Sequence, residues 1–217
     1  MTGKTKKMEP RTLEVKRNET TRSILEAAKL VFAEVGFSGA RIDEIAKRAK
    51  VNKAMIYYRI GDKEALYGKV LHEVFADTAK RIATNIKSAQ EPEAKLETYI
   101  HNLFQTIQKN PYLPQIMVRE IASGGRYFPE VVLEDFATIL GILMNILREG
   151  AEKGVFIKTN PLMVHVMFIG PVMSLKVIEA IKGEGTILAE TLSRVIKTFP
   201  ENIEEEIQKL VLRAVKK

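Results

Sequence analysis

The chain of 217 residues contains no cysteine, which excludes disulfide bonds, thiolate chemistry and cysteine-ligated metal sites. Its three histidines are far apart in the sequence, and none belongs to a metal-binding spacing such as HExxH. The sequence also lacks a GxSxG motif, a phosphate-binding glycine loop and a nucleophile with an evident base. These absences predict a protein that is not an enzyme and that needs no metal and no cofactor.

Long hydrophobic runs are missing as well. No apolar stretch reaches the roughly 18 residues that a membrane-spanning helix requires. The N-terminus is rich in lysine, but no apolar stretch or cleavage pattern follows it. We therefore expect a cytoplasmic protein with no membrane partner.

The excess positive charge lies entirely in the first third of the chain. Residues 1–63 carry 15 lysines and arginines against eight aspartates and glutamates, whereas residues 64–217 carry 19 of each kind. A polyanion is therefore the expected partner of the first third, and nucleic acid is the commonest polyanion. A solubilising tail would explain the charge of residues 1–17 equally well, but not the basic residues inside the predicted helices.

Apolar residues recur every three or four positions through most of the chain, and this spacing predicts an all-α fold. Residues 1–18 are polar and aperiodic, which predicts a flexible basic arm. The first helix is expected from Thr20 or Thr21 to Gly36. Asn52 and Asp62 are the predicted N-caps of the third and fourth helices, and Asn160 is the predicted N-cap of the later helix that contains Pro171. The other helices are predicted over 42–49, 53–60, 63–88, 92–109, 112–123, 129–152, 160–182, 187–198 and 201–215.

The second and third predicted helices are joined by a tight turn, which is the pattern of a helix-turn-helix. At 100° per residue, Ile56 and Ile60 share one face of the third helix, and Ala54 and Tyr58 share the opposite face. We expect the isoleucines to dock and the opposite face to point outward. In a DNA major groove, Ala54 would allow close backbone approach, and the hydroxyl of Tyr58 could bond phosphates or base edges. The alternative is a basic helical hairpin that is packed only for stability.

Residues 24–66 contain the segments AAKLVFAEVGF, RIDEIAKRA and VNKAMIYYRIGDKEAL. This stretch resembles the DNA-binding domain of TetR-type bacterial transcriptional regulators. The resemblance implies a three-helix DNA-binding domain at residues 19–66 and a larger helical domain for effector binding and dimerisation at residues 67–217. It also implies DNA contacts, including a phosphate contact by Lys63 at the start of the fourth helix. The implied contact residues are Arg41, Asn52, Lys53, Ala54, Met55, Tyr57, Tyr58, Arg59 and Lys63.

The sequence departs from the family pattern in the turn, where Lys50 stands at a position that often carries glycine. If this residue needs a positive φ, a cost of about 1 kcal/mol or more is expected. Arg59 and Ile60 also differ from the usual residues of the family, so base-specific roles are not transferred to this chain.

The resemblance further implies a homodimeric repressor that a small, largely apolar effector releases from a pseudo-palindromic DNA operator. The effector is expected among the helices that span residues 92–182. Core packing remains the alternative role for the histidines and methionines. The candidate effector contacts are His101, Phe104, Met117, Met144, His165 and Phe168. The candidate dimer contacts on the helix at 160–182 are Phe168, Val172, Leu175 and Ile178.

Two other functions stay open at this point. A constitutive DNA-binding or architectural protein without an effector would use its 150 neutral helical residues for dimerisation alone. An all-α enzyme with a basic arm is the third possibility, and the lack of any catalytic constellation argues against it.

Overall fold

The computed structural model describes residues 10–180, 190–191, 194 and 202–217, without the side chains of residues 10–16, 177 and 180. The chain divides into two compact units, Met1–Val70 and Leu71–Lys217, and the division falls inside helix α4 (Lys63–Asn85). Regular structure in the described residues is helical, apart from an isolated β-bridge between Phe156 and Lys216. The all-α prediction is therefore confirmed.

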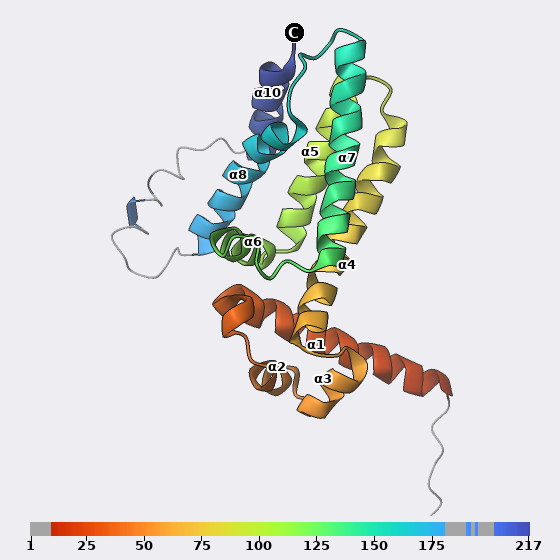
Figure 1. The fold of residues 1–217 in the computed structure, drawn as a ribbon, viewed down its shortest axis with the longest axis vertical. Coiled ribbons are helices and arrows are strands. Elements are labelled where there is room, and N and C mark those ends of the chain that lie inside the picture. Colours follow the sequence, from red (N-terminus) through yellow and green to blue (C-terminus); the bar gives the residue numbers. More distant parts are fainter. Residues whose placement is uncertain (1–9, 181–189, 192–193, 195–201) are drawn as a thin grey trace, which may run out of the picture. The chain divides into compact units, whose positions relative to one another are not determined.

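The first unit consists of α1 (Pro10–Gly39), α2 (Ile42–Ala49), α3 (Lys53–Arg59) and the first turns of α4 (Figure 1). Its core contains Phe32, Ile45, Ile56 and Tyr67, whose side chains are almost fully buried. The rings of Phe32 and Tyr67 meet edge to face with centroids 4.7 Å apart. Apolar burial of this kind is the main force that holds short helices such as α2 and α3 in place.

Helix α1 begins at Pro10, about ten residues before the predicted cap at Thr20 or Thr21. Proline is well suited to the first position of a helix, and residues 11–19 include several strong helix formers, Arg, Leu, Glu and Lys. Half of the predicted arm, residues 10–18, is therefore helical, while residues 1–9 lie outside the described residues. The predicted stop is confirmed, because Gly36 leaves helical geometry with φ 70° and ψ 178°.

Two predicted caps of the first unit are also present. Asn52 Oδ1 accepts a hydrogen bond of 2.9 Å from the backbone N–H of Ala54. Asp62 Oδ1 accepts one of 2.8 Å from the N–H of Ala65. These bonds satisfy amide groups that have no partner within the first turn of α3 and of α4.

The second unit contains the rest of α4 together with helices that match the predicted ranges closely. A short 3-10 turn (Ile86–Ser88) follows α4. The helix predicted at 187–198 falls almost entirely outside the described residues. The other helices are α5 (Pro92–Lys109), α6 (Leu113–Ala122), α7 (Glu130–Glu152), α8 (Pro161–Ala180) and α10 (Ile203–Val215).

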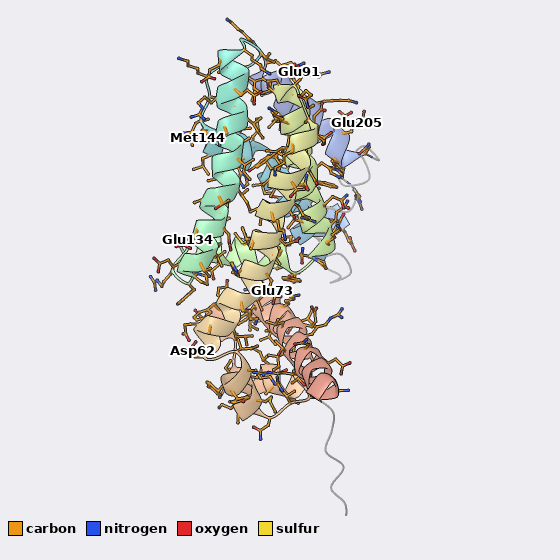
Figure 2. The ribbon with its side chains drawn as sticks, turned by 90° about the vertical axis from the view of Figure 1, so that its right-hand side faces the viewer. Asp62, Glu73, Glu91, Glu134, Met144 and Glu205 are labelled. Carbon is orange, nitrogen blue, oxygen red and sulfur yellow. The ribbon has the colours of Figure 1, made fainter. Side chains whose placement is uncertain are left out.

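Helices α5, α7, α8 and α10 enclose the core of the second unit (Figure 1). Leu96, Tyr99, Leu143 and Phe168 are among its most deeply buried residues. Helix α7 turns only one face to this core, and Met144 on its other face is exposed (Figure 2). Among the described residues, none of the helices is both long and apolar enough to cross a bilayer.

The start of α8 is capped as the sequence predicts. Asn160 Oδ1 accepts hydrogen bonds from the N–H groups of Leu162 and Met163, at 2.8 and 3.3 Å. Pro161 occupies the first turn, where its missing N–H costs nothing, and Pro171 lies inside the helix as expected. Residues 161–180 therefore form the predicted helix up to the limit of this described range.

Candidate DNA-binding surface and ligand cavity

Helix α3 has the two opposite faces that helical geometry predicts. Ile56 is fully buried, whereas Tyr58 is 78% exposed. Ala54 and Tyr57 are exposed as well, and Ile60 is half-buried. The outward face is therefore available to a partner, and the buried isoleucine fixes its direction.

Basic residues surround this outward face. Arg41 directly precedes α2, and Lys53 begins α3; both side chains are exposed. The ammonium group of Lys53 pairs with Asp43, with Nζ 3.0 Å from Oδ1. The hydrogen bond with Asp43 raises the pKa of Lys53, so the lysine is fully charged at neutral pH. Asn52, by contrast, uses its side-chain oxygen to cap α3.

Arg59 and Lys63 are held more tightly by the protein than the sequence suggested. Arg59 Nη1 donates to the carbonyl oxygen of Arg17 at 3.4 Å. Lys63 Nζ donates to the carbonyl oxygens of Phe37 and Ala40 at 3.1 and 3.4 Å. It also lies 4.3 Å from the centroid of the Phe37 ring. Lys63 therefore stabilises the end of α1, and its expected phosphate contact would compete with these interactions.

Met55 is half-buried on the flank of α3, and its sulfur accepts a hydrogen bond of 3.2 Å from Arg59 Nε. Arg48 on α2 bridges Glu34 and Glu44 through hydrogen bonds of 2.7 and 2.8 Å. Arg48 therefore forms surface ion pairs with these two carboxylates.

Lys50 adopts the left-handed conformation, with φ 56° and ψ 40°. Its position ends α2, where the N–H of Val51 donates to the carbonyl oxygen of Ala46 at 3.0 Å. A hydrogen bond of this kind is typical of a helix C-terminus that ends in a left-handed residue, and that residue is usually glycine. The positive φ on which the expected cost depended is therefore present at Lys50, and any residue with a Cβ atom is strained in this conformation.

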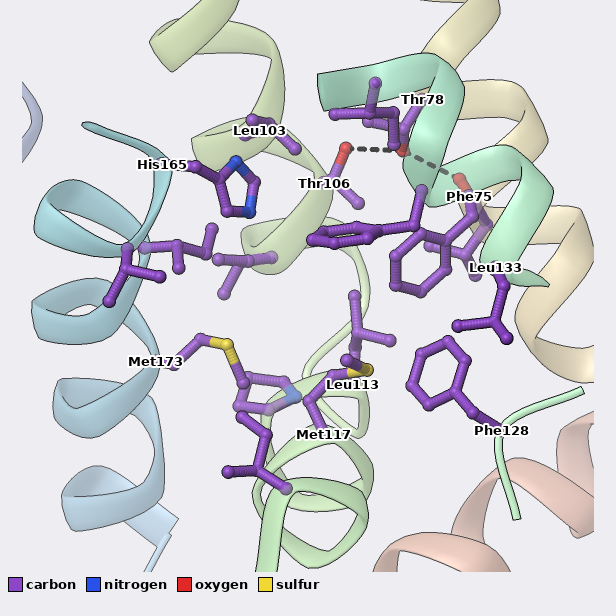
Figure 3. Close-up of a pocket in the computed structure, with 18 of the residues that line it drawn as sticks. Phe75, Thr78, Leu103, Thr106, Leu113, Met117, Phe128, Leu133, His165 and Met173 are labelled. Carbon is purple, nitrogen blue, oxygen red and sulfur yellow. Dashed lines mark hydrogen bonds between the residues drawn. The ribbon is translucent and has the colours of Figure 1, made fainter. Parts of the chain in front are cut away.

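The second unit contains an apolar cavity of about 290 Å³ between α4, α5, α6, α7 and α8 (Figure 3). Most of its walls are aliphatic and aromatic, and among the described lining residues the polar side chains are those of two threonines and a histidine. The lining residues are Val74, Phe75, Thr78, Leu103, Thr106, Ile107, Leu113, Pro114, Met117, Ile121, Phe128, Leu133, Phe136, Ile139, Leu162, His165, Val166, Ile169 and Met173.

Two of the six predicted effector contacts, Met117 and His165, line this cavity. His101 does not, because its half-exposed ring bonds Glu204, with Nδ1 2.6 Å from Oε1. Phe104 lines a separate, more polar depression of about 280 Å³ between α5, α8 and the start of α10.

Met144 and Phe168 also lie outside the cavity wall. Met144 points to the surface of α7, and Phe168 is 1% exposed within the core. Sequence periodicity assigned all these residues to helices, but it does not distinguish the side of a helix that lines a cavity from the side that fills a core.

His165 is a buried, ionisable residue of the cavity wall. Its Nδ1 atom lies 2.9 Å from the hydroxyl oxygen of Tyr99. Burial lowers the pKa of His165 to about 4, so the imidazole is neutral at physiological pH. Burial also raises the pKa of Tyr99, which keeps its hydroxyl protonated. The ring of His165 faces the cavity interior (Figure 3).

The predicted dimer contacts divide into two kinds. Phe168 and Val172 are 1% and 3% exposed and belong to the core of their own unit, so they are not available to a second subunit. Leu175 and Ile178 are half-buried. The apolar residues that α8 does expose are Leu162, Met163, Val166 and Met167.

Most cavity residues were not predicted from the sequence. Val74, Phe75 and Thr78 come from α4, and Phe128 comes from the segment before α7. Their spacing has the ordinary helical period, so no local signal separates them from core residues. Within the described residues, no cluster of three or more acidic, histidine or cysteine side chains could hold a metal ion.

Comparison with known proteins relates the first unit to a family of regulators. Residues 24–70 match the family of bacterial regulatory proteins named tetR. The transcriptional repressor SCO4008 of Streptomyces coelicolor is 31% identical over 145 residues, which cover 65% of this chain and 70% of that protein. The transcriptional repressor NicS of Pseudomonas putida is 30% identical over 141 residues, 64% of this chain and 66% of that protein. The match to the repressor DhaR of a Mycobacterium spans 46% of that relative.

Solved structures extend the likeness to the second unit. HlyIIR, a hemolysin II transcriptional regulator, has 25% identity and a TM-score of 0.61, covering 93% of this chain and 99% of HlyIIR. FadR of Bacillus subtilis, which was crystallised with stearoyl-CoA, shares the fold with a TM-score of 0.64 at 20% identity, covering 88% and 97%. Because residues 24–70 match this family and SCO4008, which is 31% identical, aligns over 70% of its own length, the chain belongs to the TetR family of bacterial regulatory proteins.

Proposed function

We propose that the protein is a transcriptional repressor that binds its DNA operator as a homodimer and leaves it when a small apolar molecule fills the cavity. The relatives SCO4008 and NicS, both described as transcriptional repressors, support the first part. The outward face of α3 supports DNA binding, because Ala54 and Tyr58 are exposed beside basic residues.

The apolar cavity carries the second part of the proposal. Helix α4 is continuous from Lys63 to Asn85. It places Leu66 and Tyr67 in the core of the first unit and Phe75 and Thr78 in the wall of the cavity. A ligand that favours one position of α4 would shift the population of DNA-competent molecules, because one helix contributes to both units.

Dimerisation follows from the expected two-fold symmetry of the DNA operator. One helix-turn-helix reads a half-site, and two copies about 34–36 Å apart read successive turns of the same groove. Helix α8 offers a surface stripe of Met163, Met167, Gly170 and Ser174, at spacings of four, three and four residues. Apolar and small residues in this arrangement allow two helices to pack closely. We infer that the dimer uses this stripe, in place of the buried Phe168 and Val172.

The test begins with selection of bound sequences from a random DNA pool, and a pseudo-palindrome is the expected result. Fluorescence anisotropy on the selected DNA should then show a decrease in log affinity with log salt of about 0.9 per phosphate neutralised. A flat salt response would refute the electrostatic part. Cavity ligands that bind the protein without changing its operator affinity would instead support a constitutive DNA-binding protein.

A further inference from the structure

The two threonines of the cavity wall have no free proton for a ligand. Thr78 Oγ1 donates to the carbonyl oxygen of Val74 at 2.7 Å, and Thr106 Oγ1 donates to that of Asn102 at 2.9 Å. The two hydroxyl oxygens also lie 2.9 Å from each other (Figure 3). Both hydroxyl protons therefore have acceptors within the protein, and neither threonine is a ready donor to a molecule in the cavity.

The hydrogen bond between Tyr99 and His165 fixes the tautomer of the imidazole. The Tyr99 hydroxyl is buried and needs an acceptor, and His165 Nδ1 lies 2.9 Å away. If Nδ1 carried the proton, the buried tyrosine O–H would lose this acceptor, which is unfavourable. Tyr99 is therefore the donor, Nδ1 is the acceptor, and the imidazole proton is on Nε2. No hydrogen bond among the described residues occupies Nε2, so the cavity has one N–H to offer.

The cavity wall also selects against charge. None of its described lining residues is Lys, Arg, Asp or Glu. The nearby Arg81 is engaged by Thr106 and by the carbonyl oxygen of Asn102, and its Nε lies 3.3 Å from Asp77 Oδ2. A carboxylate or ammonium group in the cavity would lose its hydration without gaining a counter-charge, which disfavours its binding.

We propose that the cavity binds an uncharged, mainly apolar molecule that carries one hydrogen-bond acceptor, such as a ketone, ester or amide oxygen, and that His165 Nε2 donates to this acceptor. The inference deepens the proposed function and rests on it for the regulatory consequence. The binding event itself can be measured without DNA.

Three probes of nearly the same shape separate the contributions of shape, hydrogen bonding and charge. 2-Acetylnaphthalene carries a ketone oxygen, 2-ethylnaphthalene has no acceptor, and 2-naphthoate is an anion at pH 7.5. Isothermal titration calorimetry should give the ketone a dissociation constant about five- to tenfold lower than that of the hydrocarbon, as expected for one net hydrogen bond. The anion should bind more weakly than both. Equal affinity for ketone and hydrocarbon, tighter binding of the anion, or no binding of any probe would overturn the proposal.

Substitution of the donor assigns the preference to a residue. His165→Phe should retain the binding of 2-ethylnaphthalene, which shows that the cavity is intact, and lose the preference for the ketone. His101→Phe is the matched control, because the same change occurs on a half-exposed histidine of α5 outside the cavity; it should keep the preference. A ketone preference that survives His165→Phe would overturn the assignment.

The operator experiment distinguishes this inference from the proposed function. If 2-acetylnaphthalene binds with the expected preference but does not change the anisotropy of operator DNA, the ligand class stands and the proposed release by such a ligand fails. If the protein binds operator DNA but the three probes show no preference, the proposed ligand class fails and the DNA-binding part of the proposed function stands.

Discussion

The ammonium group of Lys53 at the start of α3 lies 3.0 Å from Asp43 Oδ1 on α2. This ion pair joins the two helices of the helix-turn-helix at its exposed side, where a DNA phosphate would approach. In the free protein, Asp43 therefore pairs with the ammonium group that is proposed to contact a DNA phosphate. In the proposed complex with DNA, a phosphate beside Lys53 would compete with Asp43 for the same ammonium group.

Replacing Asp43 with Asn should strengthen operator binding. The carboxylate no longer competes for Lys53, and one negative charge is removed from the DNA-facing side. Because exposed ion pairs are weak, the expected gain is about two- to fivefold in affinity. Fluorescence anisotropy at several salt concentrations measures it. Glu26→Gln, which removes the partner of Lys29 on α1, is the control for net charge. An equal gain from both variants would show that the release of Lys53 is not the cause.

Tyr58 and Ile56 lie on opposite faces of α3, and their substitutions should separate binding from folding. Tyr58→Ala should reduce operator affinity and leave thermal unfolding nearly unchanged, because this side chain is largely exposed. Ile56→Ala should destabilise the first unit by about 2–4 kcal/mol, because it removes a fully buried side chain. Anisotropy and thermal denaturation followed by circular dichroism measure the two effects. Unchanged affinity in Tyr58→Ala would refute the contact assignment.

The helices of this protein could be predicted from the sequence because their signals are local. Asn52, Asp62 and Asn160 each cap the helix that they were expected to cap. The early part of α1 was missed because residues 10–18 are mostly polar and show no apolar stripe, so that only their helix propensity favours a helix there. Local signals of this kind depend on near neighbours in the chain, which the sequence displays directly.

The cavity could not be predicted in the same way. His165 and Phe168 lie three residues apart in α8 with similar burial, yet only His165 lines the cavity. The difference depends on how α8 packs against α5 and α7, which no short segment encodes. The same reason explains why Phe168 and Val172 were placed at a dimer interface that their burial excludes.

Lys50 is a position where one substitution should stabilise the fold. Its φ of 56° costs about 1–2 kcal/mol for a residue with a Cβ atom, whereas glycine adopts this conformation freely but loses more entropy on folding. Lys50→Gly should therefore raise the free energy of unfolding by about 0.5–1 kcal/mol, as measured by urea denaturation. Lys50→Ala removes the charge and keeps the Cβ atom, so it should not stabilise. Stabilisation by both variants would show that the charge of Lys50, not its backbone, is unfavourable.

Gly170 offers a direct test of the proposed dimer surface. A Cβ atom added there meets no atom within 4 Å among the described residues, so a larger side chain is compatible with the fold of one subunit. Gly170→Leu should nevertheless prevent close packing of two α8 helices. Light scattering after size exclusion should then report 24.5 kDa, the mass of one chain, in place of twice that mass. Gly141→Leu on α7 has equal room and should remain dimeric. A dimeric Gly170→Leu protein would exclude this stripe from the interface.

The burial of His165 predicts a specific dependence of stability on pH. Its ring packs edge to face against the aromatic rings of Phe136 and Phe168, with centroid distances of 5.3 and 5.4 Å, and burial lowers its pKa from 6.5 to about 4. Between these values the unfolded chain binds a proton that the folded chain does not bind. The contribution of the neutral ring is therefore complete above pH 6.5 and is lost as the pH falls toward 4, by about 3 kcal/mol. The difference in unfolding free energy between the wild type and His165→Phe isolates this contribution, because the other titrating groups are common to both proteins. That difference should become less favourable to the wild type from pH 7 to pH 4, and a constant difference would mean that His165 is not buried as a neutral imidazole.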